Sequence, residues 1–243
     1  MVERGLVSSR TEASRLIDGG WVLVSGAVAL SSSRLVDAGE PVVVRNASRW
    51  VGRGAEKMDH ALSTFALDVT DRHVLDAGAS TGGFTDCLLQ RGAAGVLAVD
   101  VGRNQLHERV RSDPRVISRE GTDVRSLHPV DLPFSCSLVV ADLSFISLTK
   151  VMAPLLACAS PEPGHPRPVA VLLVKPQFEV GHREASRGRG IITDPTLHEQ
   201  AIGSVADSVR ANGATVEATT ESPVKGAKGN TEFLMLVGLA PVP

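Results

Sequence analysis

The segment VLDAGASTGGF, residues Val74 to Phe84, decides the fold of this protein. Its short apolar run, its acid and its three glycines are typical of a buried strand that turns directly into a helix. Beyond this segment, apolar runs rich in Val and Leu alternate with helical patterns, which predicts strands that are buried on both faces. The sequence therefore predicts an α/β protein built around a doubly wound, mainly parallel sheet.

Hydrophobic periodicity along residues 73–239 predicts the order of the elements. Strands and helices alternate, and two final strands are expected to form an antiparallel hairpin at one edge of the sheet. In chain order, the expected elements are strand 73–78, helix 84–92, strand 95–102, helix 104–111, strand 115–124, strand 136–145, helix 148–159, strand 168–178, helix 196–212, and strands 214–222 and 232–239.

The beginning of the chain predicts a small α+β domain. A serine, Ser8 or Ser9, is placed to cap a helix that starts near Arg10, with Glu12 in the capping-box position for Ser9. Apolar runs after this helix predict short strands. We assign this small domain to residues 1–44, an interdomain linker to 45–56, and a larger domain to 57–243.

The overall composition is that of an ordinary globular protein, with 43% hydrophobic and 21% charged residues and a net charge of −2. No apolar run approaches the ~18 residues of a membrane span, and the N-terminus has no signal-peptide core, so we expect a cytoplasmic protein without a membrane partner. Cys87, Cys136 and Cys158 form no CxxC pair. This spacing argues against a disulfide framework and against a metal site.

The glycine turn is expected to bind a ligand, because a doubly wound sheet holds ligands beyond the carboxyl ends of its strands. A dinucleotide site would have glycine where this sequence has Ser80, and no Walker lysine follows the turn. Asp76 suits a ligand with an ammonium group, and Asp100, at the end of the next strand, is placed to accept both hydroxyls of a ribose. S-adenosylmethionine has an ammonium, a ribose and an adenine, so it is the predicted cofactor.

Further residues complete the predicted cofactor site. Asp123 follows the third strand, where a carboxylate can accept the adenine amino group, but a helix cap explains this residue equally well. Phe84 is expected to belong to the core in either case. The predicted cofactor-binding residues are Asp76, Gly78, Ser80, Thr81, Gly82, Gly83, Phe84, Asp100, Val101, Asp123 and Val124.

Three ionisable residues, Asp142, Lys175 and Glu232, stand at the ends of predicted strands that open on this site. Buried charges are costly unless they are paired or used, so a structural ion pair is the alternative to a catalytic role. The segment ADLSF lacks the signature of amine methylation, and no cysteine is placed to attack a pyrimidine ring. A ribose 2′-hydroxyl remains as the methyl acceptor, with Lys175 activating it and the two acids orienting the lysine.

Residues 51–240 resemble the FtsJ/RrmJ-type Rossmann methyltransferases through the segments RGAEKM, ADLSF, VKPQFE and GNTEF. This resemblance implies a Rossmann-like methyltransferase sheet and a catalytic tetrad of Lys57, Asp142, Lys175 and Glu232. The segment SSRTEASRLIDGGWVLVSG resembles the S4 RNA-binding domain. Together the two parts resemble the TlyA (haemolysin A) family, which implies 2′-O-methylation of cytidine in ribosomal RNA, with S-adenosylmethionine as cofactor and ribosomal subunits as partners.

Both domains are expected to contact RNA. Residues 1–54 carry seven arginines, no lysine and five acids, and arginine binds phosphate oxygens through two parallel hydrogen bonds. The segment after Lys175 contains His182 and arginines separated by glycines, which suits a clamp on RNA phosphates. A solvated surface explains both patterns equally well. The predicted RNA-binding residues are Arg4, Ser9, Arg10, Arg15, Arg34, Arg183, Arg187 and Arg189.

Two other functions compete with methylation. The name haemolysin suggests a membrane-active cytotoxin, but the sequence has no long amphipathic helix with a strongly basic face. A non-catalytic ribosome-binding protein of the S4 type would bind RNA without binding the methyl donor. The presence of all four tetrad residues favours the enzyme.

Overall fold

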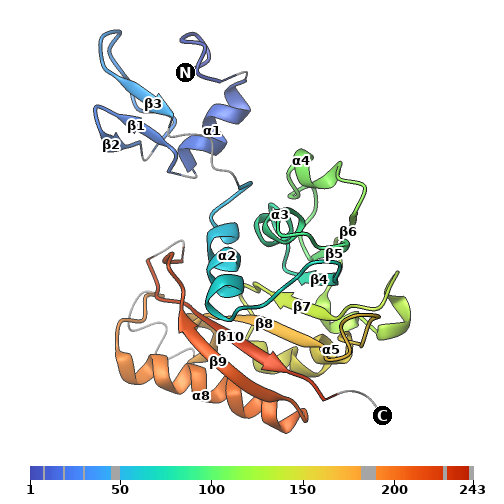
Figure 1. The fold of residues 1–243 in the computed structure, drawn as a ribbon. Helices are drawn as coiled ribbons and strands as arrows, with labels where there is room; N and C mark the ends of the chain where they lie inside the picture. Colours follow the sequence, from blue (N-terminus) through green and yellow to red (C-terminus); the bar gives the residue numbers. More distant parts are fainter. Residues whose placement is uncertain are drawn as a thin grey trace. The chain divides into compact units, whose positions relative to one another are not determined.

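Two compact units, residues 1–53 and 54–243, make up the computed structural model (Figure 1). The structure describes residues 1–7, 9–18, 20–29, 31–44, 50–181, 190–226 and 229–240. The second unit begins with helix α2 (Gly54–Thr64), so the last three residues of the range interpreted as a linker form the first turn of a helix. Each unit has its own sheet and its own apolar core.

The N-terminal unit consists of a helix and a three-stranded antiparallel sheet with the order β2-β1-β3. The hydroxyl of Ser9 accepts a hydrogen bond from the backbone N–H of Glu12 at 3.1 Å, which is the predicted N-cap. The turn Ser25-Gly26 joins the first two strands, and its φ angles of 50° and 82° are those of a tight hairpin. The elements are α1 (Arg10–Asp18), β1 (Val22–Val24), β2 (Ala27–Val28) and β3 (Val42–Val44).

The second unit alternates strands and helices. Its strands are β4 (His73–Ala77), β5 (Gly95–Asp100), β6 (Val116–Glu120), β7 (Leu138–Ala141), β8 (Val169–Val174), β9 (Thr215–Glu221) and β10 (Phe233–Gly238). Its helices after α2 are α3 (Gly83–Gln90), α4 (Glu108–Arg111), α5 (Met152–Ala157), α6 (Pro176–Glu179) and α8 (Pro195–Ala211), with 3₁₀ turns η1 (Val124–Ser126), η2 (Pro129–Asp131) and η3 (Leu148–Lys150). Among the described residues, no helix combines the length and the apolar character needed to cross a bilayer.

The seven strands of this unit form one sheet in the order β6-β5-β4-β7-β8-β10-β9. β4 pairs in parallel with β5 on one side and with β7 on the other, and β6 and β8 continue the parallel pattern. β10 is antiparallel to both of its neighbours, with β9 at the edge, as the expected hairpin requires. The winding direction reverses between β4 and β7, which confirms the doubly wound sheet and puts the switch point at the end of β4.

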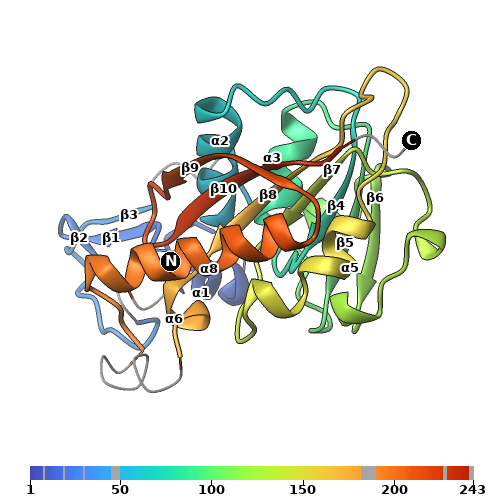
Figure 2. The ribbon, with the colours of Figure 1, turned by 90° about the horizontal axis from the view of Figure 1, so that it is seen from below.

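Helices cover both faces of this sheet because its central strands are apolar on both sides. Along β4, Leu75 and Ala77 point into the core that α5 and α8 share, while Val74 and Asp76 point to the other face. Figures 1 and 2 show α5 and α8 on one side of the sheet and α2 and α3 on the other. The alternation along β4 therefore decides which side chains can reach which layer.

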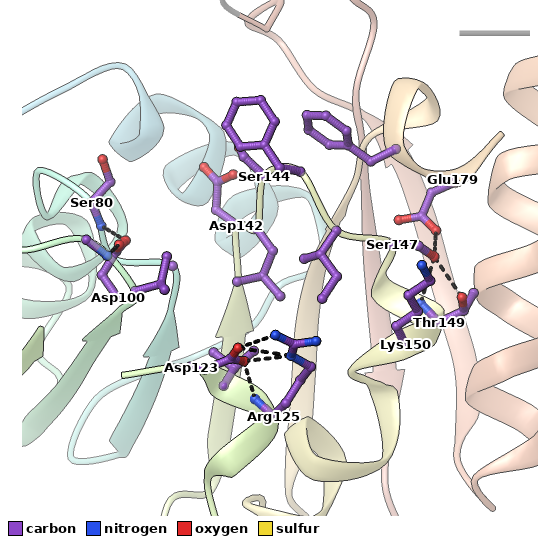
Figure 3. A pocket seen from close by; sticks show the side chains of 18 of the residues that line it. Ser80, Asp100, Asp123, Arg125, Asp142, Ser144, Ser147, Thr149, Lys150 and Glu179 are labelled. Carbon is purple, nitrogen blue, oxygen red and sulfur yellow. Dashed lines mark hydrogen bonds and ion pairs between the residues drawn. The ribbon is translucent and has the colours of Figure 1, made fainter. Parts of the chain in front are cut away.

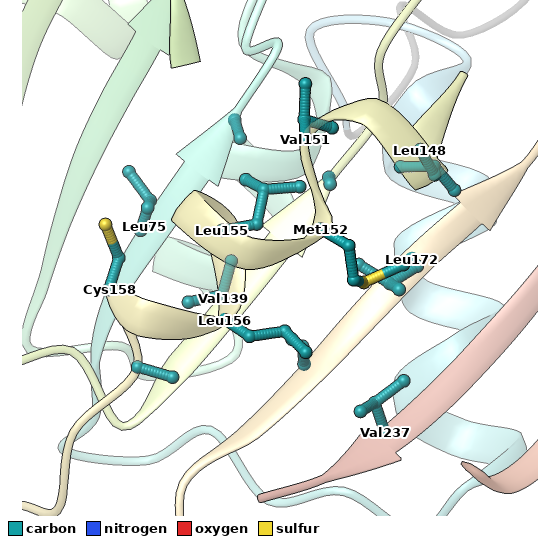
Figure 4. Packing of buried hydrophobic residues seen from close by; sticks show 14 of the residues in the cluster. Leu75, Val139, Leu148, Val151, Met152, Leu155, Leu156, Cys158, Leu172 and Val237 are labelled. Carbon is teal, nitrogen blue, oxygen red and sulfur yellow. The ribbon is translucent and has the colours of Figure 1, made fainter. Parts of the chain in front are cut away.

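The larger core lies between the sheet and α5 with α8. Figure 4 shows the part of this core around α5. Met152 and Leu155 of α5 are each 1% exposed and belong to the same cluster as Leu75, Val139 and Leu172 of the strands. Burial of a side chain of this size stabilises the fold by about 1.5–3 kcal/mol. This packing fixes the segment that runs from the end of β7 into α5.

The predicted helix at 104–111 is wrong in its first half, because only the last turn, α4, is helical. Backbone N–H groups of Gln105 and Leu106 donate to the carboxylate of Glu120, at 2.6 and 3.1 Å. Asn104 takes a left-handed φ of 57° just before them. An acceptor on the neighbouring strand thus replaces the intrahelical bonds, and helical periodicity contains no signal for such an acceptor.

The predicted helix at 148–159 is divided into η3 and α5 at Val151, whose φ is −122°. Pro154 lies in the first turn of α5 and has no backbone N–H. It cannot donate to the carbonyl of Lys150, so a continuous helix would lose that hydrogen bond.

A carboxylate joins the amino ends of two neighbouring central strands, β4 and β7. The side chain of Glu162 is 6% exposed and accepts hydrogen bonds from the backbone N–H groups of His73, at 3.1 Å, and Ser137, at 3.0 Å. It also contacts Nδ1 of the His73 ring at 2.6 Å. Glu162 therefore satisfies backbone donors at the starts of β4 and β7, which are neighbours in the sheet.

Replacing Glu162 with alanine is expected to lower the free energy of unfolding by about 2–3 kcal/mol, because these donors lose their acceptor. Glu162→Gln keeps one oxygen and is expected to lose about half as much. Urea unfolding measures both effects, with Glu199→Ala on the exposed side of α8 as the matched control. An unchanged unfolding free energy for Glu162→Ala would contradict the assigned role.

Candidate active site

A cavity of about 1060 Å³ opens at the carboxyl ends of the parallel strands (Figure 3). Its walls come from the segments that follow β4, β5, β6 and β7, and from α6 with the residues after it. This is the switch point of the sheet, where the sequence predicted a ligand. Single ligand pockets measure about 300–1,000 Å³, so the cavity has room for a cofactor together with part of a substrate.

Asp100 organises the half of the cavity next to β4 and β5. Its carboxylate oxygens accept hydrogen bonds from the backbone N–H groups of Ser80, at 2.8 Å, and Gly102, at 2.7 Å. These bonds fix the carboxylate in the cavity wall and leave it with acceptor capacity for hydroxyl groups of a ligand. Ser80 takes a left-handed φ of 47°, and its bond to Asp100 holds the turn in this form.

Gly78 occupies a position where a side chain does not fit. Its φ of 86° is left-handed, and an added Cβ would lie 2.4 Å from the backbone oxygen of Asp142. The backbone N–H of Asp142 in turn donates to the carbonyl of Ala77 at 3.0 Å. The turn after β4 and the segment after β7 therefore touch backbone to backbone, which joins the two halves of the cavity.

Asp76, which was predicted to face the cofactor's ammonium group, points to the other face of the sheet. It is fully buried, its Oδ2 accepts a hydrogen bond from the hydroxyl of Thr85 on α3 at 2.6 Å, and its Oδ1 has no partner. Burial, assisted by the neighbouring charge of Asp142, raises the pKa of Asp76 to about 7. A direct role in cofactor binding stays a prediction for this residue.

The raised pKa of Asp76 has a consequence for stability. Between about pH 4 and pH 7 the carboxyl is protonated in the folded protein and ionised in the unfolded chain, because its pKa rises from 3.8 to about 7 on folding. The folded state binds the additional proton, so the stabilisation is fully present below pH 4 and is lost as pH rises to 7. The total loss is a few kcal/mol at most.

Wild type is therefore expected to lose stability between pH 5 and pH 7 through Asp76, and Asp76→Asn is expected to show a flatter dependence. Thermal unfolding of both proteins across this range measures the difference. If the stability of both proteins changes equally with pH, the carboxyl of Asp76 is ionised in the folded state throughout this range.

Six of the predicted cofactor-binding residues line the cavity, namely Gly78, Ser80, Asp100, Val101, Asp123 and Val124. The other five do not line it, namely Asp76, Thr81, Gly82, Gly83 and Phe84. Phe84 is 4% exposed, and its ring packs beside Gly54 at the start of α2. A Cβ added to Gly83 would lie 3.1 Å from the backbone nitrogen of Ala55. The second part of the glycine turn thus allows α2 and α3 to pack closely.

Asp123 lines the cavity, but hydrogen bonds to Arg125 occupy its carboxylate. It accepts from the backbone N–H of Arg125 at 2.9 Å as the N-cap of η1, and it pairs with the guanidinium at 2.5 Å. These side-chain and backbone hydrogen bonds lower the pKa of Asp123. The helix-cap interpretation of this residue is therefore confirmed, and binding of an adenine by Asp123 stays a prediction.

Lys175 is a buried cation that contacts two residues of the cavity wall and does not itself line the cavity. It follows β8 and is 7% exposed. Its Nζ lies 2.6 Å from Oδ1 of Asp142 and donates to the hydroxyl of Ser144 at 2.9 Å. Both partners line the cavity. A buried ammonium requires such partners, and here they hold it beside the space where a substrate would lie.

Lys57 and Glu232 form a second buried ion pair. The Nζ of Lys57, on α2, donates to Oε2 of Glu232 at 2.5 Å, and the two side chains are 10% and 3% exposed. A Cβ added to Gly226 would lie 2.4 Å from Oε1 of Glu232, so the glycine leaves room for this carboxylate. The pair fastens α2 to the beginning of β10.

The register of the sheet brings the two ion pairs to the same end of the strands. Phe233 at the start of β10 pairs with Val174 at the end of β8 in the antiparallel ladder. The residue before Phe233 is Glu232 and the residue after Val174 is Lys175, so these two stand opposite each other. The four residues that the sequence predicted as a tetrad therefore form two ion pairs near the carboxyl ends of the parallel strands, and of these four only Asp142 lines the cavity.

Several polar residues of the cavity were not predicted from the sequence, among them Ser144, Gln177 and Glu179. Glu179 accepts hydrogen bonds from the hydroxyl of Ser147 at 2.5 Å and from the backbone N–H of Leu148 at 2.9 Å. Burial raises the pKa of Glu179, and these bonds oppose the shift. Glu179 joins α6 to the segment after β7. The available signal was that all three residues lie within four positions of a predicted tetrad residue.

Predicted RNA-binding residues of the N-terminal unit make contacts inside that unit. The guanidinium of Arg4 donates to the backbone carbonyls of Asp37 and Glu40, both at 2.7 Å. Arg34 pairs with the carboxylate of Glu40 at 2.8 Å, Ser9 caps α1, and Arg10 is exposed. The side chain of Arg15 and the residues Arg183, Arg187 and Arg189 lie outside the part of the chain that the structure describes.

The sequence matches two known families. Residues 50–239 match the FtsJ-like methyltransferases, and residues 1–42 match the S4 domain. The 16S/23S rRNA (cytidine-2′-O)-methyltransferase TlyA of Mycobacterium tuberculosis is 44% identical over 237 residues, which cover 97% of this chain and 86% of that protein. Hemolysin A of Brachyspira hyodysenteriae is 37% identical over 234 residues, 95% of this chain and 94% of that protein.

A solved structure of a "putative hemolysin" from Streptococcus thermophilus is similar to this one, with a TM-score of 0.78 and 36% sequence identity. The similarity covers 99% of this chain and 86% of that one. Matches of this identity and length extend over both units and over every segment that meets at the cavity. The chain therefore belongs to the TlyA family, in which an S4 domain precedes an FtsJ-like methyltransferase domain.

Proposed function

We infer that this protein methylates the 2′-hydroxyl of a cytidine in ribosomal RNA, with S-adenosylmethionine as the methyl donor. The observation that supports this most strongly is Lys175, a buried cation held by Asp142 at the switch-point cavity. Membership of the FtsJ-like methyltransferases supports the donor. The relative from Mycobacterium tuberculosis, whose name states cytidine 2′-O-methylation, supports the acceptor.

The chemistry of the cavity wall fits S-adenosylmethionine. Asp100 is held by two backbone N–H groups and has acceptor capacity for both ribose hydroxyls. Val101 and Val124 line the same half and offer apolar contacts for the adenine ring. When bound, the donor would supply a methyl group on a positively charged sulfur.

Lys175 would act on the acceptor. A ribose hydroxyl is a weak nucleophile, and negative charge develops on its oxygen as it attacks. Lys175 can stabilise that charge as an ammonium, or it can accept the proton after losing its own. Asp142 holds the amine in place at 2.6 Å in either case. The site would further contribute to catalysis by aligning the ribose hydroxyl with the methyl group for in-line displacement.

Lys57 and Glu232 would support Lys175. Glu232 stands opposite Lys175 in the antiparallel ladder of β8 and β10. The carboxylate of Glu232 accepts a hydrogen bond from the amine of Lys57 at 2.5 Å. A pair of this kind orients the neighbouring lysine without touching the methyl group. We propose that these four residues act as one unit.

Ribosomal RNA is the polymer that both units would bind. The match of residues 1–42 to the S4 domain supports RNA binding by the N-terminal unit, with the exposed Arg10 as one candidate contact. Assembled ribosomal subunits are the proposed partners, and the cytoplasm is the proposed place of action.

Mapping 2′-O-methyl groups on ribosomal RNA tests this function. Ribosomal subunits that lack the modification are incubated with the purified protein and S-adenosylmethionine, and the RNA is then digested and analysed by mass spectrometry. We expect new 2′-O-methylcytidine that requires both protein and donor. A methyl group on a base, or no new methyl group, would refute the proposal. Calorimetric titration with the donor separates the enzyme from a non-catalytic S4-type binding protein.

A further inference from the structure

The half of the cavity farther from β5 is lined by the segment after β7 and by α6. Most of its polar side chains already have partners. The hydroxyl of Ser144 accepts from Lys175 at 2.9 Å, and the hydroxyls of Ser147 and Thr149 lie 2.7 Å apart. The carboxylate of Glu179 accepts from Ser147 and from the backbone of this segment. These groups are used in holding the wall together.

Gln177 differs from these neighbours because its amide oxygen is unpaired. The side chain borders the cavity, and its Oε1 is shielded from solvent without any hydrogen-bond donor. A buried acceptor without a donor costs about 1–3 kcal/mol, and such groups are rare in folded proteins. The physical explanation that fits a cavity wall is a donor supplied by the ligand.

The position of Gln177 identifies the part of the ligand that it can reach. It lies two residues after Lys175, and Pro176 between them starts α6 with a fixed φ. In a nucleotide, the base is attached to the carbon next to the one that carries the 2′-hydroxyl. A ribose whose 2′-hydroxyl lies at Lys175 therefore brings its own base to the residues beside Lys175.

We propose that Gln177 recognises the target base, with its amide paired to the amino group and N3 of cytosine. This inference rests on the proposed function and assigns the base selectivity of the same site. The Watson–Crick edge of cytosine presents a donor and an acceptor side by side, and an amide presents the complementary acceptor and donor. Uracil presents the reverse order at the same two positions, so an amide oxygen facing the cytosine amino group would meet an oxygen of uracil.

Other lining residues of this half are less suited to the task. The amino group of cytosine requires an acceptor, and Lys150 has only donors. The carboxylate of Glu179 is an acceptor, but Ser147 and Leu148 already donate to it. Phe145 and Phe178, whose ring centroids lie 5.5 Å apart, have no conventional hydrogen-bonding atoms in their side chains. Gln177 is the side chain here that combines a free acceptor with a donor.

Base selectivity in the full-length protein tests this proposal. The substrates are ribosomal subunits with the mapped target cytidine and the same subunits with uridine at that position. Wild type is expected to prefer cytidine by roughly 10–100-fold in kcat/KM, the size expected when a substrate edge leaves a buried polar group unpaired. Gln177→Met removes both hydrogen-bonding atoms, and the preference is expected to fall below about threefold, mainly through slower reaction of cytidine.

Two further variants and one binding measurement keep the test decisive. Gln177→Glu retains an acceptor for the amino group and is expected to retain a preference for cytidine. Gln200→Met makes the same chemical change at an exposed position of α8 and is expected to retain both rates. The affinity of Gln177→Met for S-adenosylmethionine, measured by calorimetry, is expected to equal that of wild type.

The outcomes separate this inference from the proposed function. An undiminished preference in Gln177→Met, or a loss of donor affinity in that variant, overturns the role of Gln177. Wild type that methylates both substrates equally also overturns it while leaving the proposed reaction intact. Wild type that methylates no ribosomal RNA refutes the proposed reaction itself.

Discussion

Lys175→Ala is expected to reduce methylation of ribosomal RNA by about a thousandfold or more, since acid–base and charge-stabilising groups each contribute factors of about 10²–10⁴. The amine lies beside the cavity in contact with Asp142 and Ser144, and no other described lysine contacts either of them. Its loss removes the group that handles the acceptor's proton or charge. Donor affinity should stay within about tenfold, or roughly 1.4 kcal/mol, because Asp100 and the glycine turn lie in the other half of the cavity.

Three measurements make this result interpretable. Methyl transfer is measured on ribosomal subunits, donor affinity by calorimetry, and folding by thermal unfolding, because removal of Lys175 leaves Asp142 without its partner. Arg210→Ala on α8 removes an exposed cation that pairs with Asp207 and serves as the matched control, with methylation near that of wild type. Loss of donor binding in Lys175→Ala would mean that the lysine builds the donor pocket.

Gly78→Ala is expected to destabilise the protein by about 3 kcal/mol or more and to weaken donor binding by at least about a hundredfold. Two effects act together at this position. The backbone has a φ of 86°, and the new Cβ would lie 2.4 Å from the backbone oxygen of Asp142. A backbone atom at the end of a buried strand cannot turn away as a flexible side chain can. The turn after β4 must therefore move, and with it the N–H of Ser80 that holds Asp100.

Gly213→Ala separates the two effects. Gly213 has a similar φ of 77°, but an added Cβ there would meet nothing within 4 Å. It is expected to lose only about 1 kcal/mol and to bind the donor as wild type does. Urea unfolding and calorimetric titration of both variants measure the difference. If Gly78→Ala behaves like Gly213→Ala, the close approach to Asp142 does not hold the cavity together.

Local patterns predicted most of the architecture. The segment 74–84 contains most of β4, the turn and the start of α3, so the beginning of the sheet could be located without knowledge of any tertiary contact. The errors arose where distant atoms intervene. The carboxylate of Glu120 holds residues 105 and 106 outside α4, and no periodicity announces an acceptor on another strand. The break before α5, in contrast, had a local signal in Pro154.

The candidate site shows the same division. Lys57 and Glu232 are 175 positions apart, and their types and motifs marked them as candidates before their contact was known. Asp76 was also marked, but strand alternation turns its side chain toward Thr85 and away from the cavity. The unpaired amide oxygen of Gln177 has no counterpart in the sequence, because whether a polar atom has a partner depends on every neighbour that packs around it.

The sequence by itself determined the succession of strands and helices and the chemical types at the strand ends, because backbone preferences and hydrophobic periodicity act over a few residues. Only the tertiary structure decided which of these side chains meet. Strand order and register place Glu232 opposite Lys175. The face of the sheet to which a strand side chain points decides whether that side chain can line the cavity. Such contacts join residues that are distant in the chain, so they exist only once the sheet has formed.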